Sequence, residues 1–220
     1  ESIPEGLPDD IEFNPGGLAV VWAEENSRTS IFSALKRKEV YGTSGPRFLV
    51  RFFLGDDLDE NLCNRSDAIS HAYENGVPMG GTVKSNSMKK VKLFVSASSD
   101  LSNDKQYIEK LQVIKGVIKN GEVETSIYDV KSSEPTTLDL NTCEVVGSGD
   151  KSMCTLWEDK DFNKGDEAYY YVRVIANQSC RWSHDLCVKN PNYCQEDEDA
   201  SIPKIIQERA WTSPVWLENS

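Results

Sequence analysis

The run Ala168-Tyr-Tyr-Tyr-Val-Arg-Val174 decides the fold class of this chain. The residues of this stretch alternate in two sets. Tyr170, Val172 and Val174 form one set, and the other is Tyr169, Tyr171, Arg173 and the following Ile175. Successive side chains of a strand point to opposite faces of its sheet, and aromatic and β-branched residues are enriched in strands. The run therefore predicts a long β-strand, and the surrounding chain is expected to supply its neighbours.

Further strands are predicted on both sides of this run. Alternating apolar residues over 91–95 predict one strand, and residues 111–117 predict the next. Asn120-Gly121 separates the latter from residues 123–130, and this dipeptide favours a two-residue hairpin turn because both positions tolerate positive φ. Residues 211–216 are predicted to form a closing edge strand, where a proline is tolerated. Short strands with turn signals between them predict a mostly antiparallel, β-sandwich-like domain.

The N-terminal part has a different pattern. A continuous apolar run over residues 18–22 predicts a strand that is buried on both faces. A helix is predicted directly after it, over residues 28–38, with Asn26 or Ser27 as its cap. Three apolar residues fall on one face of that helix: Ile31, Phe32 and Leu35. A strand followed at once by a helix is an α/β unit, so the predicted fold class is α+β.

The chain is therefore expected to have three parts. Residues 1–47 would form the strand–helix element. Residues 48–88 would be a connecting segment, with a strand over 48–54 and a short helix over 66–74. Residues 89–220 would be a β-rich C-terminal domain.

Composition and charge exclude some classes of function. The chain has 220 residues, 38% of them hydrophobic and 27% charged, which is an ordinary globular balance. Its formal net charge of -12 repels phosphate backbones and argues against nucleic-acid binding. No apolar stretch approaches the roughly 20 residues that span a bilayer. The sequence opens without Met and without a signal peptide, so we expect it to be part of a longer polypeptide.

The cysteines predict an oxidising compartment. There are six, at Cys63, Cys143, Cys154, Cys180, Cys187 and Cys194, and their spacing suits neither zinc fingers nor thioredoxin motifs. An even number in polar contexts favours disulfides, so a periplasmic or secreted location is expected. We expect Cys143 and Cys154 to close a local loop, with another bridge among the last three cysteines. Free, buried thiols are the alternative.

Three segments together carry a family resemblance. They are residues 14–26 (Asn-Pro-Gly-Gly-Leu-Ala-Val-Val-Trp-Ala-Glu-Glu-Asn) with 31–47, residues 76–81 (Gly-Val-Pro-Met-Gly-Gly), and residues 168–174 with 180–183 (Cys-Arg-Trp-Ser) and 208–214 (Glu-Arg-Ala-Trp-Thr-Ser-Pro). In combination they resemble the C-terminal third of a large family of exported bacterial proteins. That family is related to the polymerase-and-histidinol-phosphatase (PHP) superfamily of metal-dependent hydrolases.

The resemblance implies that most of the chemistry lies outside this chain. In such proteins a distorted (β/α) barrel binds metal ions, chiefly through His-x-His and Asp-x-His motifs. This chain has only His71 and His184, in neither arrangement. The metal-binding barrel would lie upstream of Glu1 in the same polypeptide and would hold Zn, Mn or Fe, with no cofactor in this chain alone. Residues 14–47 would be the last barrel elements, and the small-molecule substrate is left open.

Glu24 and Glu25 are the candidate catalytic residues. They follow the predicted strand and lead into the predicted helix, and catalytic groups of barrels gather at the C-terminal ends of the strands. A carboxylate there can bind a metal or orient a ligand water. The alternative is a pair of charges near a helix N-terminus, stabilised by the helix dipole.

The turn that contains Thr43, Ser44 and Arg47 is a candidate anion site. A guanidinium beside glycine amides and two hydroxyls can bind phosphate or sulfate. The alternative is a turn whose Arg47 anchors a carboxylate across the domain.

Asp159, Asp161 and Asn163 are weak calcium candidates, because oxygen ligands at alternate positions are typical of calcium loops. Gly165 and Tyr170 do not fit the EF-hand pattern, so a solvated loop before a strand is the alternative.

Seven aromatic residues could form a platform for sugars or peptides, or cross-strand pairs in the core: Trp157, Tyr169, Tyr170, Tyr171, Trp182, Trp211 and Trp216.

The leading hypothesis is the C-terminal portion of an exported PHP-like hydrolase, phosphoesterase-like by family analogy and not catalytic alone. The alternatives are a stand-alone β-sandwich that binds a ligand, and a structural domain pinned by disulfides.

Overall fold

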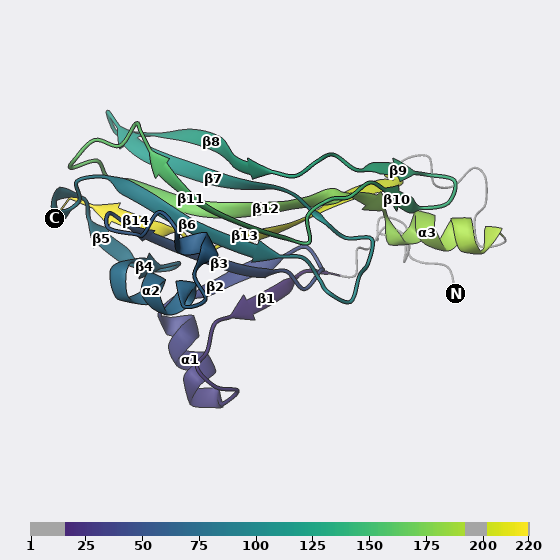
Figure 1. Ribbon diagram of the computed structural model, residues 1–220, viewed down its shortest axis with the longest axis horizontal. Helices are drawn as coiled ribbons and strands as arrows, with labels where there is room; N and C mark the ends of the chain where they lie inside the picture. The colour runs from purple at the N-terminus through teal and green to yellow at the C-terminus, as the bar shows by residue number, and fades with distance from the viewer. Residues whose placement is uncertain (1–15, 192–201, 220) are drawn as a thin grey trace, which may run out of the picture.

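The structure is a computed structural model that describes residues 16–191 and 202–219. In this part of the chain the strands form an eight-stranded, a four-stranded and a two-stranded sheet, almost all antiparallel. Helices are few and lie outside the sheets (Figure 1). The predicted sandwich-like, mostly antiparallel fold is confirmed.

The large sheet is built around β12, the strand that contains the aromatic run. β7 pairs with one edge of β12 along most of its length, and β14 and β13 share the other edge. The parallel pair β14–β5 is the exception to antiparallel pairing. The strands of this sheet are β1 (Leu18–Val21), β2 (Val40–Thr43), β5 (Thr82–Lys84), β7 (Ile108–Lys119), β8 (Glu122–Ser132), β12 (Ala168–Cys180), β13 (Ile205–Thr212) and β14 (Val215–Glu218).

The smaller sheets and the helices complete the described part. The four-stranded sheet contains β3 (Leu49–Gly55), β4 (Val77–Pro78), β6 (Val91–Ser98) and β11 (Ser152–Asp159), and β9 (Thr137–Asp139) pairs with β10 (Glu144–Val146). The α-helices are α1 (Arg28–Lys36), α2 (Ala68–Asn75) and α3 (Trp182–Lys189), and the 3-10 turns are η1 (Leu62–Asn64) and η2 (Ser85–Ser87).

The main core lies between the two larger sheets. Tyr170, Val172 and Val174 of β12 are buried there against side chains of β3 and β6, such as Phe52 and Leu93. Each fully buried apolar side chain of this size contributes roughly 1.5–3 kcal/mol. The alternation along β12 thus reports which of its residues face the opposite sheet.

The Asn120-Gly121 hairpin is confirmed. β7 and β8 pair up to Lys119 and Glu122, and both turn residues have positive φ, 54° and 83°. These values are the ones that a two-residue type I′ turn requires, which explains why asparagine and glycine occupy the turn.

The N-terminal strand and helix are present, but β1 is not buried on both faces as predicted. It pairs with β2 at the edge of the large sheet, and all four of its residues are exposed or half-buried. Helix α1 is confirmed, with Ser27 as its cap. Successive strands of a (β/α) barrel run parallel, whereas β1 and β2 run antiparallel around α1. The described residues therefore contain no strand–helix–strand unit of barrel type here.

The predicted edge strand over residues 211–216 is wrong in detail. β13 ends at Thr212 and β14 starts at Val215, because Pro214 has no N–H for the ladder. The Pro214 carbonyl instead accepts a hydrogen bond from the Gly80 amide at 2.9 Å. β14 is not an edge strand either, since it lies between β12 and β5.

The three expected parts contribute to the same sheets. β2, from the expected first part, pairs with β13 from the third, and β3, from the second, pairs with β6. The boundaries at residues 47 and 88 thus do not separate one sheet from another.

The expected Cys143–Cys154 bridge is wrong. Cys154 on β11 bonds to Cys63 of η1, and Cys143 bonds to Cys180 at the end of β12. The two expected partners belong to different sheets. Cys154 lies on β11 of the four-stranded sheet, whereas Cys143 directly precedes β10 of the two-stranded sheet. Cys187 is also disulfide-bonded, and Cys194 lies outside the described residues.

The disulfides and the helices bear on location. The bridges Cys63–Cys154 and Cys143–Cys180 join distant parts of the sequence, which is compatible with an extracellular protein. Among the described helices, none has the length and apolar character that crossing a bilayer requires.

Candidate functional site

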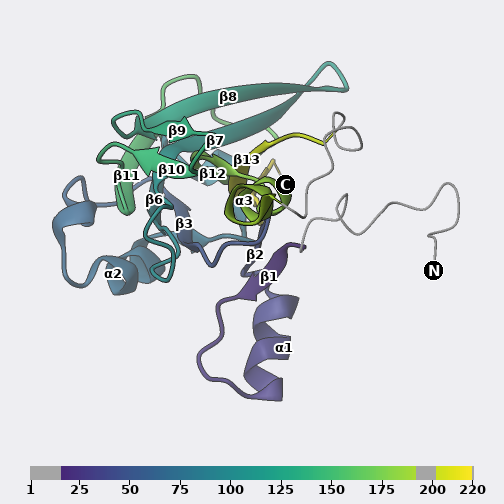
Figure 2. The same cartoon turned by 90° about the vertical axis from the view of Figure 1, so that its right-hand side faces the viewer.

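The candidate site is a cleft at the base of α1, where the two larger sheets come together. Figure 2 shows α1 extending away from the sheets, with β1 and β2 at its base. The cleft has a volume of about 570 Å³. Its lining residues are Trp22, Ala23, Glu24, Arg37, Glu39, Arg51, Tyr73 and Pro78.

Arg51 is held in this cleft by an aromatic ring and a tyrosine hydroxyl. Its guanidinium carbon lies 3.3 Å from the centroid of the Trp22 ring, and Nη1 donates to the Tyr73 hydroxyl at 3.0 Å. The Trp22 indole is itself fixed, since Nε1 donates to the Val50 carbonyl at 2.9 Å. Stacking of guanidinium on an aromatic ring restricts its rotation, so Arg51 is oriented before any ligand arrives.

Glu39 is the buried carboxylate beneath Arg51, with a side chain that is 5% exposed. The Tyr73 hydroxyl donates to Oε1, and Arg37 Nη2 lies 3.4 Å from Oε2. Arg51 Nη1 is 3.9 Å from Oε1. A buried carboxylate is tolerable only with such partners, and here two cations and one hydroxyl supply them.

The backbone at the end of α1 places Glu39. Lys38 has a positive φ of 60°, the left-handed conformation that commonly ends a helix, and the Glu39 amide then donates to the Ala34 carbonyl at 3.1 Å. Gly80 packs against this turn with φ +89°, and a Cβ there would collide with the Lys38 carbonyl. The close approach of the two turns therefore requires glycine at position 80.

The surroundings of Tyr73 shift its pKa. Burial raises the pKa of the Tyr73 hydroxyl above its usual range, and its hydrogen bond to the Glu39 carboxylate raises that pKa further. In the described part of the chain the Arg51 guanidinium makes no other hydrogen bond, so its remaining N–H donors are available to an oxyanion in the cleft.

Of the two candidate catalytic residues, only Glu24 lines this cleft. Both follow β1, and both donate their backbone amides to the Ser30 hydroxyl, at 3.1 and 3.3 Å. Glu25 instead borders a neighbouring depression together with Thr29 and Ser33. Neither carboxylate makes an ion pair with the residues that the structure describes.

The candidate anion turn lies at the opposite end of the β1–β2 pair. Antiparallel pairing matches Leu18 with Thr43, so residues after Thr43 and residues after Val21 leave the sheet at different ends. The Ser44 hydroxyl donates to the Glu208 carboxylate, and the Arg47 amide donates to Asp100 Oδ2 at 3.1 Å. This turn thus binds two carboxylates of the chain through the Ser44 hydroxyl and the Arg47 backbone amide, whereas the alternative considered above was a carboxylate anchored by the Arg47 side chain.

Two of the three candidate calcium residues, Asp159 and Asp161, bind a cation of the protein itself, the Lys115 ammonium. Lys115 Nζ lies 2.6 Å from Asp159 Oδ2, with the two side chains 5% and 0% exposed. The Tyr170 hydroxyl donates to the same oxygen at 2.6 Å, and the Asp161 amide donates to Oδ1 at 2.9 Å. Both oxygens of the Asp159 carboxylate thus have partners within the protein and need no calcium ion. Asn163 bonds instead to Asp166.

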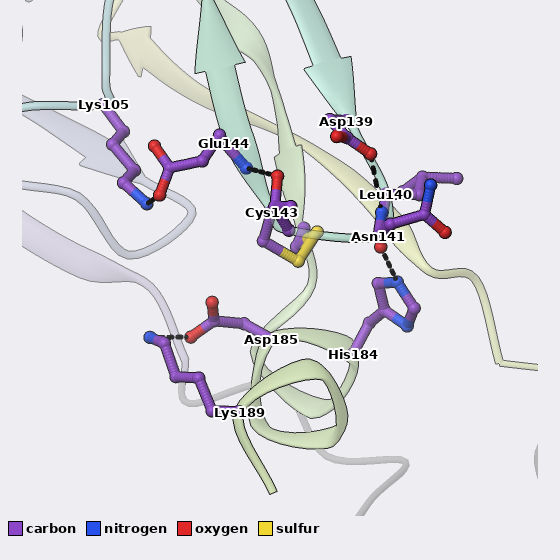
Figure 3. Close-up of a disulfide and its surroundings, with 11 residues drawn as sticks. Lys105, Asp139, Leu140, Asn141, Cys143, Glu144, His184, Asp185 and Lys189 are labelled. Atoms are coloured by element: carbon purple, nitrogen blue, oxygen red, sulfur yellow. Dashed lines mark hydrogen bonds and ion pairs between the residues drawn. A yellow bond between two sulfur atoms is a disulfide. The ribbon is translucent and has the colours of Figure 1, made fainter. Parts of the chain in front are cut away.

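The end of the molecule near α3 contains a group of potential metal ligands, drawn in Figure 3. Ligand atoms of Cys143, Cys180 and His184 lie within 4.8 Å of one another. The two sulfurs form a disulfide, and His184 Nε2 is hydrogen-bonded to the Leu140 carbonyl at 2.9 Å. Since metal binding needs thiolates, the disulfide form of this group is not a metal site.

Three residues of the cleft, Arg51, Glu39 and Tyr73, were not among the predicted site residues. Arg51 lies in the strand predicted over residues 48–54 and Tyr73 in the helix predicted over residues 66–74, and no motif distinguished either residue. One signal was available for Glu39, which directly follows the basic run at the end of the predicted helix. The pairing across β2, β3 and α2 is a tertiary contact that no local pattern predicts.

Comparison with known proteins identifies the family. A family model described as Protein of unknown function (DUF3604) matches residues 5–219. The chain therefore belongs to this family. No curated protein and no solved structure matches it.

Proposed function

We propose that this member of the DUF3604 family is the β-sandwich part of an exported bacterial, PHP-like metal-dependent hydrolase. The metal ions, Zn, Mn or Fe, would be held by a barrel that precedes it in the same polypeptide. The reaction would be hydrolysis of a phosphoester or similar bond in a small molecule. The sequence resemblance supports the reaction class, and the disulfides support export.

The observation that carries the proposal is the uncovered apolar face of α1. Phe32 and Leu35 are 62% and 52% exposed on a helix that extends away from the sheets (Figure 2). An amphipathic helix normally buries such a face against a neighbour. The barrel is the neighbour we propose, and α1 with β1 would border it from outside rather than complete it.

The cleft would then open toward the seam between the two parts. Arg51, stacked on Trp22, would bind an oxyanion of the substrate or a carboxylate of the barrel. Glu24 at its rim would orient a water or a metal ligand from the barrel. These roles position groups around the reaction and leave metal binding to the barrel.

The first test compares the chain with the longer polypeptide. Hydrolysis of p-nitrophenyl phosphate is measured for both, each supplied in turn with Zn, Mn or Fe. We expect turnover in the longer polypeptide alone. Equal turnover in both would overturn the proposal, because catalysis would then lie within this chain.

The second test addresses the α1 face directly. Leu35→Glu in the longer polypeptide is expected to lower turnover at least tenfold, since a charge would enter the seam, which corresponds to about 1.4 kcal/mol. Leu101→Glu is the matched control, because Leu101 is 79% exposed and follows Asp100, which accepts a hydrogen bond from Arg47 beyond the end of the β1–β2 pair that is opposite α1. Unchanged turnover in Leu35→Glu would contradict the proposed contact.

A further inference from the structure

A second pocket lies on the outer face of the large sheet, next to β14. Its volume is about 220 Å³, and it shares no residue with the cleft at α1. Its lining residues are Ile118, Glu167, Ala168, Tyr169, Trp216, Leu217 and Glu218. The pocket thus combines aromatic and aliphatic walls with two carboxylates.

Two aromatic rings form one side of this pocket. Tyr169 and Trp216 are directly opposite in the β12–β14 ladder, with ring centroids 5.4 Å apart and planes inclined by 57°. On its other side Tyr169 pairs with Gly116, and a Cβ at that glycine would collide with the tyrosine ring. The absence of a side chain at position 116 therefore lets the ring lie over β7, with Trp216 inclined toward it.

Two carboxylates lie beside these rings. The ladder pairs Ala168 with Leu217, so Glu167 and Glu218 come next on the two strands and reach the same end of the sheet. Like charges on neighbouring strands are unfavourable. Neither carboxylate makes an ion pair within the part of the chain that is described, although Lys84 lies opposite Glu218 in the ladder.

We propose that this pocket binds a small organic cation, an alkylammonium group. The ring faces of Tyr169 and Trp216 attract a cation through their quadrupoles, and the adjacent carboxylates would be neutralised by it. The aliphatic contact from Ile118, which is itself 52% exposed, suits an alkyl-substituted ammonium better than a metal ion. The inference is independent of the hydrolase proposal, because it uses none of the same residues.

The test uses choline as the probe and 3,3-dimethylbutan-1-ol, its uncharged isostere, as the comparison. Binding to the 220-residue chain is followed by the indole N–H signals in nitrogen–proton correlation spectra, at constant ionic strength. The Trp216 signal is assigned with Trp216→Phe. We expect choline to shift this signal and to bind at least tenfold more tightly than the isostere, about 1.4 kcal/mol.

Variants of the pocket distinguish the contribution of its carboxylates to choline binding from that of its shape. The double change Glu167→Gln with Glu218→Gln is expected to weaken choline binding about tenfold and to leave the isostere unaffected, which corresponds to about 1.4 kcal/mol. Glu122→Gln and Trp211→Phe are controls, since both lie on the same sheet outside the pocket, and neither should change choline binding. Equal affinity for the isostere, or no choline-dependent shift of the Trp216 signal, would overturn the proposal.

Discussion

The interior of the sandwich and the cleft at α1 contain the same three kinds of group, a cation, a carboxylate and a tyrosine hydroxyl. In the interior they are Lys115, Asp159 and Tyr170, and in the cleft they are Arg51, Glu39 and Tyr73. In both, the tyrosine hydroxyl donates to the carboxylate. The two clusters differ in exposure, because the interior cation is 5% exposed and the cleft cation 23%.

This difference in exposure indicates that the two clusters have different roles, although they contain the same kinds of group. In the interior the ammonium also donates to the Asp161 carbonyl at 3.1 Å, and the carboxylate is filled by three donors, so the cluster is complete without a ligand. In the cleft the guanidinium has one hydrogen bond and an open side. The interior cluster is structural, because it is buried and all its charged groups have partners. The cleft cluster is a candidate site, because a ligand can reach its guanidinium.

The largest expected effect is in the interior. Lys115→Met leaves the Asp159 carboxylate buried without its cation, and removal of one partner of a buried ion pair costs about 3–5 kcal/mol. Urea denaturation of the chain measures this loss. The double change Lys115→Met with Asp159→Leu should recover part of it, because no unpaired charge remains. A loss below about 1 kcal/mol would mean that the interior pair behaves like an exposed one.

Alkaline pH should also separate the two clusters. Burial, then the hydrogen bond to Asp159, raises the pKa of Tyr170 far above 10.0, and burial with Glu39 raises that of Tyr73. Above pH 10 the unfolded chain loses tyrosine protons that the folded chain retains, so stability falls as pH rises. Tyr170→Phe should reduce this fall more than Tyr73→Phe does, as followed by urea midpoints from pH 8 upward. Equal slopes in the two variants would contradict the difference.

In the cleft, Glu39→Gln should cost less than the interior change. Glutamine keeps a hydrogen bond to Tyr73 but no longer balances the two guanidiniums, and water in the cleft can solvate them. We expect about 1–2 kcal/mol, between the values for exposed and buried pairs. If thermal or urea unfolding shows a loss as large as that of Lys115→Met, the cleft is as structural as the interior.

The smallest expected effect is that of Tyr73→Phe. Its hydroxyl joins Arg51 to Glu39, but Tyr73 is 43% exposed and water can replace the hydrogen bonds. We expect about 0.5–1 kcal/mol. Tyr170→Phe serves as the matched interior change and should cost more, because Asp159 loses a buried donor that water cannot replace.

The fold was largely predictable because its signals are local. The alternation along residues 168–175 identified the central strand, and Asn120-Gly121 located the hairpin. The apolar run over residues 18–22 was correct as a strand and wrong in its burial, since apolarity does not report which strand lies at the edge of a sheet. The cysteine pairing was wrong because Cys63 and Cys154, separated by 91 residues, meet only through tertiary packing.

Of the residues that line the cleft, Glu24 was the one named in advance from the sequence. Glu24 was expected near the chemistry and lies at the rim of the cleft. Arg51, Glu39 and Tyr73 come from different elements, so only the pairing of those elements brings them together. The turn at Thr43, Ser44 and Arg47 had the right chemistry for anions, and its donors to Glu208 and Asp100 show that carboxylates of the domain are bound there.

Hydrogen exchange followed by mass spectrometry tests most directly whether the α1 region is a contact surface. Exchange is compared between this chain and the longer polypeptide, with β12 as the internal reference because neighbouring strands pair with both of its edges in this chain. We predict slower exchange over residues 28–36 in the longer polypeptide and the same exchange over residues 168–180. Identical exchange over residues 28–36 in the two proteins would contradict the account.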